Sequence, residues 1–196
     1  MQLTRRRGLA RAALALALLL GAAACSPAEP PHIVLFTADT LRADHLSQAG
    51  YARDTSPRLA AFAAGAWDFR GAITVIPKTA PAFATLFTGH HPQEHGVRAN
   101  FTPVPDALPM LAERLAGAGY RTAAFVSNPA LRRENGFDRG FDRFALFAEG
   151  DGTARVARAF LAFAEEPWER PTFVWIHTID PHGPYEPPDR YAALFR

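Results

Sequence analysis

The chain has very little cysteine and very little lysine. Cys25 is its only cysteine, so no disulfide can form within one chain. Lys78 is the only lysine among 21 basic residues. An excess of positive charge is also missing: four of the basic residues lie within residues 1–24, so 17 remain against 19 acids. This balance argues against a nucleic-acid-binding protein.

A long hydrophobic run is absent too. The run from Ala12 to Ala24 is too short for a comfortable transmembrane helix, follows four arginines and ends in small residues. It predicts a signal peptide over residues 1–24. Cys25 would then carry lipid as the first residue of a lipoprotein, with residues 25–31 as a Pro-rich tether. The alternative is an ordinary signal peptide cut nearby, with Cys25 incidental. The lipoprotein hypothesis places the protein at the bacterial membrane, facing the periplasm or the exterior.

From residue 32 onward, strand-like and helix-like patterns alternate, which predicts an α/β fold with a largely parallel sheet. No internal repeat interrupts this pattern. Strands are predicted at residues 32–38, 67–76, 122–127 and 172–178, and helices at residues 56–66, 81–88, 107–118 and 153–165. Residues 135–147 are expected to form a loop that packs several phenylalanines.

Two segments carry most of the chemical information. Asp39 directly follows the first predicted strand, where a carboxylate is well placed to bind a metal ion. Thr79 stands just before Pro81 and an apolar stretch, the pattern of a helix N-terminus that favours an anion. Each has a plainer interpretation, Asp39 as a turn acid and Thr79 as a helix cap. Together they indicate hydrolysis of a phosphate or sulfate ester.

Further motifs occur in a familiar order along residues 31–196. They are Leu86-Phe87-Thr88-Gly89, Gly119-Tyr120-Arg121-Thr122 and Asp180-Pro181-His182-Gly183-Pro184-Tyr185. With the first two segments they resemble the N-terminal half of the sulfatase family, within the alkaline phosphatase superfamily. The resemblance implies an alkaline-phosphatase-like sandwich around a largely parallel sheet. Because the chain stops inside an apparent helix and lacks the family's later Asp-His or Asp-Asn pair, we expect a truncated domain, inactive alone.

The resemblance also implies roles for individual residues. Asp39 and Thr79 would bind one divalent metal ion (Ca, Mg, Mn or Zn), and Thr79 would attack a small sulfate- or phosphate-ester substrate. His182 would protonate or bind the ester oxygen. For Lys78 the alternatives are a side chain that stabilises negative charge beside Thr79 and a solvated surface side chain. For His95 they are a structural role and a position that faces the substrate.

The chain departs from the family pattern at several positions. Where sulfatases carry Cys-x-Pro-x-Arg, this chain has Thr79-Ala80-Pro81-Ala82-Phe83. Threonine cannot become the family's formylglycine aldehyde, because its β-carbon carries a methyl group. The strand after Gly119 also lacks the Lys and His that hold sulfate. These departures favour a metal-activated threonine acting on phosphoesters, and they equally suit an inactive sulfatase-like binding or structural module.

Other polar residues near these motifs have plainer expectations. Asp44 and His45 are expected in a salt-bridged turn, with support of the metal ligands as the alternative, and Arg42 is expected to form a structural ion pair rather than to touch substrate. Ser127 and Asn128 are expected in a strand-end turn, with a hydrogen bond to substrate as the alternative.

The anchor is directly testable. Cys25→Ser should release the protein from membranes or leave it uncleaved, because the thiol is the only site for the lipid. Membrane fractionation after labelling with radioactive palmitate measures this. Absence of label in the wild type, or a variant that stays processed and membrane-bound, would contradict the lipoprotein hypothesis.

Overall fold

The computed structural model describes residues 29–148 and 152–195. The chain divides into two compact units, residues 1–31 and residues 32–196. The predicted signal peptide, Cys25 and the first part of the tether lie outside the described residues. Among the described helices, none is long and apolar enough to cross a membrane.

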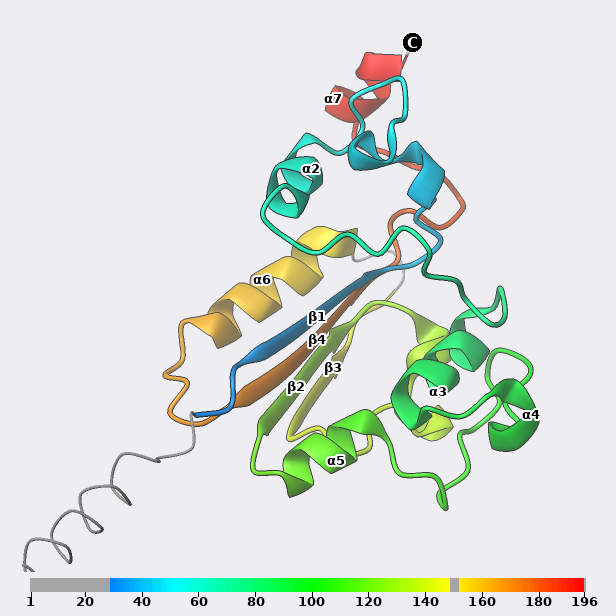
Figure 1. Ribbon diagram of the computed structural model, residues 1–196, viewed down its shortest axis with the longest axis vertical. Coiled ribbons are helices and arrows are strands. Elements are labelled where there is room, and N and C mark those ends of the chain that lie inside the picture. Colours follow the sequence, from blue (N-terminus) through cyan, green and yellow to red (C-terminus); the bar gives the residue numbers. More distant parts are fainter. Residues whose placement is uncertain (1–28, 149–151, 196) are drawn as a thin grey trace, which may run out of the picture. The chain divides into compact units, whose positions relative to one another are not determined.

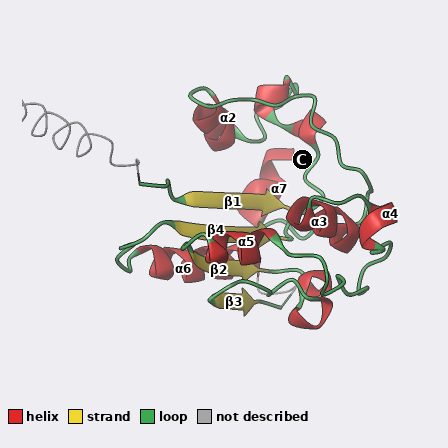
Figure 2. Ribbon diagram, turned by 60° about the horizontal axis from the view of Figure 1, so that its bottom comes forward, coloured by secondary structure: helices red, strands yellow, loops and turns green. Residues whose placement is uncertain are grey.

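A four-stranded parallel sheet forms the centre of the second unit (Figures 1 and 2). Its strands are β1 (Ile33–Ala38), β2 (Arg121–Val126), β3 (Arg143–Leu146) and β4 (Thr172–Thr178), in the spatial order β1-β4-β2-β3. Every residue of β4 is buried, as expected for a central strand covered on both faces. The predicted α/β class and the strands at residues 32–38, 122–127 and 172–178 are confirmed.

One loop prediction and one strand prediction are wrong. β3 lies within the segment expected to be a loop; it has only four residues and begins with the exposed Arg143, so its apolar pattern is only three residues long. Conversely, no strand forms within residues 67–76. There the apolar side chains of Trp67 and Ile73 are about nine-tenths exposed. This segment has strand-like composition, yet it pairs with no strand among the described residues, although β1 is an edge strand.

Helices cover both faces of the sheet (Figure 1). The helix α6 (Gly152–Ala164) lies on one face, whereas α3 (Thr79–Thr88) and α5 (Leu111–Gly117) lie on the other. Phe125 and Phe163 pack on the α6 side, and Trp175 and Phe87 pack on the α3 side. Burying side chains of this size contributes about 1.5–3 kcal/mol each.

Short elements complete the unit. They are α2 (Pro57–Ala63), α4 (Pro92–His95), α7 (Asp189–Ala192) and the 3-10 turns η1 (Ala43–His45), η2 (Ser47–Ala49), η3 (Pro129–Leu131), η4 (Arg133–Asn135) and η6 (Ala193–Phe195). The predicted helix at residues 56–66 forms as α2, but its expected apolar face is not buried: Leu59 and Phe62 are exposed. Ser56 Oγ accepts a hydrogen bond from Ser47 N rather than from its own helix.

Helix boundaries follow local chemistry. α3 begins at Thr79, two residues before the predicted start, and ends at Thr88. The next residue, Gly89, has a φ of 75°, the left-handed conformation that glycine adopts freely. α5 begins at Leu111, later than the predicted residue 107. The carboxylate of Glu113 accepts a hydrogen bond from Met110 N at 2.7 Å and caps this later start. The residue before Pro109 is disfavoured in helical conformation, which accounts for the delay.

The start of α6 is bound to a distant loop. Thr153 N, in the first turn of α6, donates to both carboxylate oxygens of Asp180, at 2.9 and 3.1 Å. Asp180 follows β4 and opens the Asp-Pro-His motif. Its carboxylate therefore caps a helix 27 residues earlier in the chain and complements the positive end of that helix's dipole.

Removal of the Asp180 cap should lower the stability of the fold. Asp180→Ala should lower the free energy of unfolding by about 1 kcal/mol, and Asp180→Asn by less, because the amide keeps one acceptor. The nearly fully exposed Asp106 supplies the control variant, Asp106→Ala. Chemical denaturation of the three variants gives the comparison. Equal stability of Asp180→Ala and Asp106→Ala would show that the contact contributes nothing.

His95, at the end of α4, ties that helix to α3. Its side chain is buried, and Val97 N donates to its Nδ1 at 3.0 Å. Nε2 therefore carries the hydrogen and donates to Thr85 Oγ1, 3.0 Å away. Burial, reinforced by the nearby His90, lowers the pKa of His95. Both ring nitrogens are used within the chain, which supports the structural alternative for this residue.

The lowered pKa of His95 predicts a pH dependence. As the pH falls through about 6.5, the unfolded chain takes up a proton that folded His95 resists, so the free energy of unfolding should decrease. His95→Gln should flatten this decrease, whereas replacing the exposed His91 by Gln should not. Thermal melts between about pH 5 and pH 8 measure the slopes. An unchanged slope in His95→Gln would refute the assignment.

Candidate functional site

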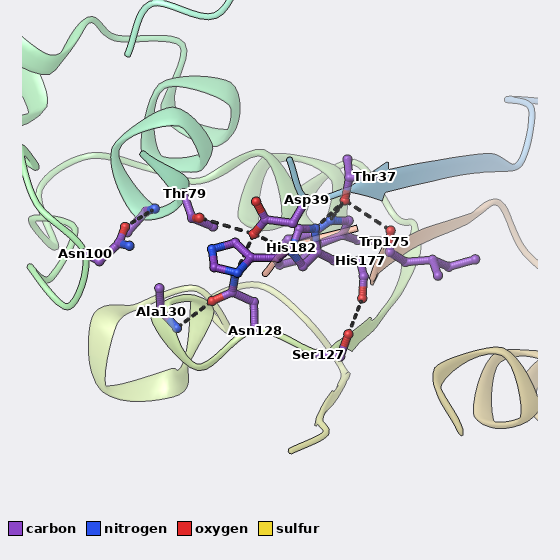
Figure 3. A network of polar contacts seen from close by, with 12 residues as sticks. Thr37, Asp39, Thr79, Asn100, Ser127, Asn128, Ala130, Trp175, His177 and His182 are labelled. Atoms are coloured by element: carbon purple, nitrogen blue, oxygen red, sulfur yellow. Dashed lines mark hydrogen bonds and ion pairs between the residues drawn. The ribbon is translucent and has the colours of Figure 1, made fainter. Parts of the chain in front are cut away.

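Asp39 occupies the carboxyl end of β1 (Figure 3). Its N–H donates to Thr178 O at 2.8 Å and so extends the ladder to β4 by one step. The next residue, Thr40, has a φ of 53°, a conformation that β-branched residues rarely adopt. The chain therefore turns sharply after Asp39, and the carboxylate remains only 9% exposed.

Three polar groups converge on a single oxygen of this carboxylate. Asp39 Oδ2 accepts hydrogen bonds from Asn128 Nδ2 at 2.5 Å and from Thr79 Oγ1 at 3.2 Å. His177 Nε2 lies 3.5 Å from the same oxygen. The other oxygen, Oδ1, accepts no hydrogen bond from any described residue. The site is thus built from the ends of β1, β2 and β4 and the start of α3 (Figure 3).

These contacts settle the charge of Asp39. Burial by itself raises the pKa of the carboxyl group, but the contact with His177 and its charge, together with the hydrogen bonds from Thr79 and Asn128, outweigh this effect. The resulting pKa lies below the ordinary value, so Asp39 is ionised at neutral pH. An ionised carboxylate with one uncommitted oxygen is suited to a cation.

The hydroxyl of Thr79 is not a helix cap. Thr79 is the first residue of α3, and its Oγ1 donates a hydrogen bond to Asp39. Capping is done instead by Asn100, whose Oδ1 accepts from Ala80 N at 3.0 Å. Because Pro81 has no N–H and Ala82 N bonds back to Lys78 O, the start of α3 offers an anion fewer N–H groups than the sequence pattern suggested.

His177, which sequence reasoning missed, lies beneath the carboxylate. It is fully buried, its Nδ1 is 2.9 Å from Thr37 Oγ1, and Thr37 Oγ1 also accepts from Trp175 Nε1 at 3.1 Å. His177 Nε2 has no hydrogen-bond partner within the described part of the chain. Phe83 packs edge-on against the imidazole, with ring centroids 5.0 Å apart.

Other residues predicted for the site are not joined to it by hydrogen bonds. Lys78 is exposed and forms no hydrogen bond or ion pair through its side chain within the described residues. His182 is exposed and its Nδ1 lies 2.6 Å from Gly183 O. Arg42 and Asp44 form an exposed ion pair at 2.7 Å, which agrees with a salt-bridged turn at Asp44 and with a structural pairing of Arg42. Asn128 is more than a turn residue: its Oδ1 caps η3 by accepting from Ala130 N, and its Nδ2 donates to Asp39.

The residues present fit a hard divalent cation in part. The Asp39 carboxylate and the Thr79 hydroxyl are oxygen ligands, the kind that Mg²⁺, Ca²⁺ and Mn²⁺ prefer. No group of three or more His, Cys, Asp or Glu side chains among the described residues gathers into a metal site. Further ligands would therefore come from water or from outside these residues.

Solved structures show the same fold. Phosphonate monoester hydrolase of Agrobacterium radiobacter aligns with a TM-score of 0.68 and 23% identity, over 84% of this chain and 44% of that one. BT4656 in complex with its substrate D-glucosamine-2-N,6-O-disulfate gives 0.73 and 19%, over 85% and 38%. The C-terminal periplasmic domain of EptC from Escherichia coli, in complex with Zn, gives 0.66 and 19%, over 85% and 48%.

Sequence relatives point the same way. Ulvan-active sulfatase of Formosa agariphila is 34% identical over 93 residues, 47% of this chain and 18% of the relative. Arylsulfatase A of Bos taurus is 36% identical over 115 residues, 56% and 22% respectively. The chain thus spans about a fifth of the length of these curated relatives. The family model described as Sulfatase matches residues 31–196, nearly the whole second unit, and the chain therefore belongs to the sulfatase family.

Proposed function

We propose that the protein is a hydrolase or transferase of phosphate or sulfate esters that uses the hydroxyl of Thr79 directly as its nucleophile. The observation that carries this proposal is the 3.2 Å contact between Thr79 Oγ1 and Asp39 Oδ2. It holds a hydroxyl against an ionised carboxylate at a helix N-terminus, in a chain of the sulfatase family. A hydroxyl used only as a cap would face its own helix instead.

One divalent cation completes the proposal. Asp39 Oδ1 and Thr79 Oγ1 would hold it, and its identity among Ca, Mg, Mn and Zn is open; the zinc in the EptC structure supports a cation of this class. When bound, it supplies Lewis acidity to the ester and lowers the pKa of a hydroxyl beside it. No formylglycine is needed, because threonine cannot form that aldehyde.

Side chains of this protein would then take separate roles in the reaction. Thr79 Oγ1, having lost its proton to solvent, forms a bond to phosphorus or sulfur while the bond to the ester oxygen breaks. His182, in the loop after β4, donates a proton to the departing oxygen. Water later cleaves the Thr79 ester and restores the hydroxyl, or an acceptor alcohol takes the group in a transferase. Asp39 orients the nucleophile throughout.

Phosphoesters are the favoured substrate class. The motif's Cys and Arg are Thr79 and Phe83 here, and the sulfate-holding Lys and His after Gly119 are absent. The likeness to a phosphonate monoester hydrolase suits this choice, and the structure with a sulfated glucosamine keeps small sulfate esters as the competing class. Lys78, exposed beside Thr79, is the nearest cation along the chain for a small anionic substrate. We place the enzyme outside the cytoplasm, anchored through Cys25.

A module without catalysis is the second candidate. It is favoured by the Asn100 cap, which occupies Ala80 N, and by the absence of any hydrogen bond from His182 to Asp39 or Thr79 among the described residues. Such a module would bind an anionic ester without cleaving it. Hydrolysis by the whole protein separates the two candidates.

Substitution of Thr79 tests the mechanism. In the whole protein, Thr79→Ser should keep substantial activity because the hydroxyl remains, whereas Thr79→Ala should lose about a thousand-fold or more. Asp39→Ala should lose activity as well, through weakened cation binding. The measurement is kcat/KM on paired nitrophenyl phosphate and nitrophenyl sulfate esters.

Two results would contradict the proposal. Full activity in Thr79→Ala would exclude the nucleophile, and a clear preference for the sulfate ester would exclude phosphoesters as the main substrates. Binding of both esters without turnover by wild type would instead support the module.

A further inference from the structure

We propose that His177 is a positioning residue for Asp39: its Nε2–H fixes Oδ2 and leaves Oδ1 turned toward the cation beside Thr79. This inference rests on the proposed function, because it assigns Asp39 to a cation. It starts from a fully buried polar atom, His177 Nε2, that has no hydrogen-bond partner in the described part of the chain. Buried polar atoms without partners are rare enough to require an explanation.

The proton on Nε2 follows from the neighbours of the ring. Thr37 Oγ1 accepts from Trp175 Nε1, so its single proton can go either to Ile176 O, at 3.2 Å, or to His177 Nδ1, at 2.9 Å. In the second case a neutral imidazole carries its hydrogen on Nε2. In the first case Nδ1 holds a proton, and a bare Nε2 lone pair would face the carboxylate. Only a protonated Nε2 makes the contact with Asp39 favourable.

The strand register sets the direction of this contact. Thr37 of β1 stands opposite His177 of β4 in the parallel ladder, and Asp39 lies two residues beyond Thr37. The Nε2–Oδ2 separation of 3.5 Å is longer than a usual hydrogen bond, yet the positive end of the Nε2–H dipole still attracts the ionised carboxylate at that distance in a buried site. Oδ2 also holds Asn128 and Thr79, so the carboxylate is fixed from three directions and Oδ1 stays uncommitted.

Phe83 keeps the imidazole in place. Its ring meets that of His177 at an angle of 83°, in an edge-to-face contact, and also packs against Trp175. Position 83 is where the family motif has Arg. In this chain an aromatic ring stands at that position and packs against the buried histidine. His177 and Phe83 act as one unit.

Cation affinity tests the inference without relying on activity. The whole protein, stripped with a chelator, is titrated with Mn²⁺ while electron paramagnetic resonance follows the free ion. His177→Phe keeps a packing ring but no donor and should bind Mn²⁺ about 10- to 100-fold more weakly, the usual effect of losing a group that orients a metal ligand. His177→Gln returns an N–H donor and should recover most of the affinity.

Control variants separate positioning from general damage. Thr178→Val alters the adjacent buried β4 residue, whose hydroxyl forms no hydrogen bond with His177 or Asp39 within the described residues, and should bind Mn²⁺ like wild type. Near-ultraviolet circular dichroism checks folding. If His177→Phe does not fold, Thr37→Val serves as the test. It removes the hydroxyl that holds His177 Nδ1 but leaves Asp39 unchanged, and it should weaken Mn²⁺ binding by a smaller factor than His177→Phe.

The outcomes are distinct. Wild-type Mn²⁺ affinity in folded His177→Phe, or in Thr37→Val where the former does not fold, overturns the inference, provided that Asp39→Ala loses Mn²⁺. Wild-type affinity in Asp39→Ala would instead refute the proposed function itself. Failure of His177→Gln to restore binding, with Thr178→Val normal, would assign the ring a packing role only.

Discussion

The convergence of donors on Asp39 Oδ2 is the interaction on which the arrangement of the site depends. An ion removed from water loses several kcal/mol of solvation unless partners replace the water. Here the replacement is shared by Thr79, Asn128 and His177. Each of these residues comes from a different segment. Their contacts with the one carboxylate therefore hold the start of α3 and the ends of three strands in fixed positions relative to one another.

Sheet order makes this convergence possible. β4 lies between β1 and β2, and all neighbouring pairs are parallel, so the residues that follow these strands meet at one edge. Asp39 and Asn128 follow β1 and β2, while His177 is the penultimate residue of β4. A strand inserted between β4 and either neighbour would separate the groups by about 5 Å, beyond hydrogen-bonding distance.

Sequence patterns predicted the parallel sheet, three of its four strands and the importance of Asp39 and Thr79, because these features depend on local periodicity and on strand ends. They did not predict His177. In the run Thr172–Thr178 it is one polar residue within an apolar strand, and its partner on β1 is set by register across 140 residues. Asn100 was missed for a similar reason, because a cap supplied from 20 residues away leaves no local pattern. The false strand at residues 67–76 had suitable composition, but its side chains stay exposed, and composition alone does not show whether a segment joins the sheet.

The Asp180 cap has a consequence for motion. Asp180 attaches the loop that carries His182 to the first turn of α6, which lies on the opposite face of the sheet from α3. Thr79 is attached to α3. Thr79 and His182, which are proposed to attack the ester and to protonate its leaving oxygen, are therefore attached to helices on opposite faces of the sheet. Any sliding of α6 against the sheet would therefore change the distance between Thr79 and His182. A small shear between the two layers would in this way alter the geometry proposed for the reaction.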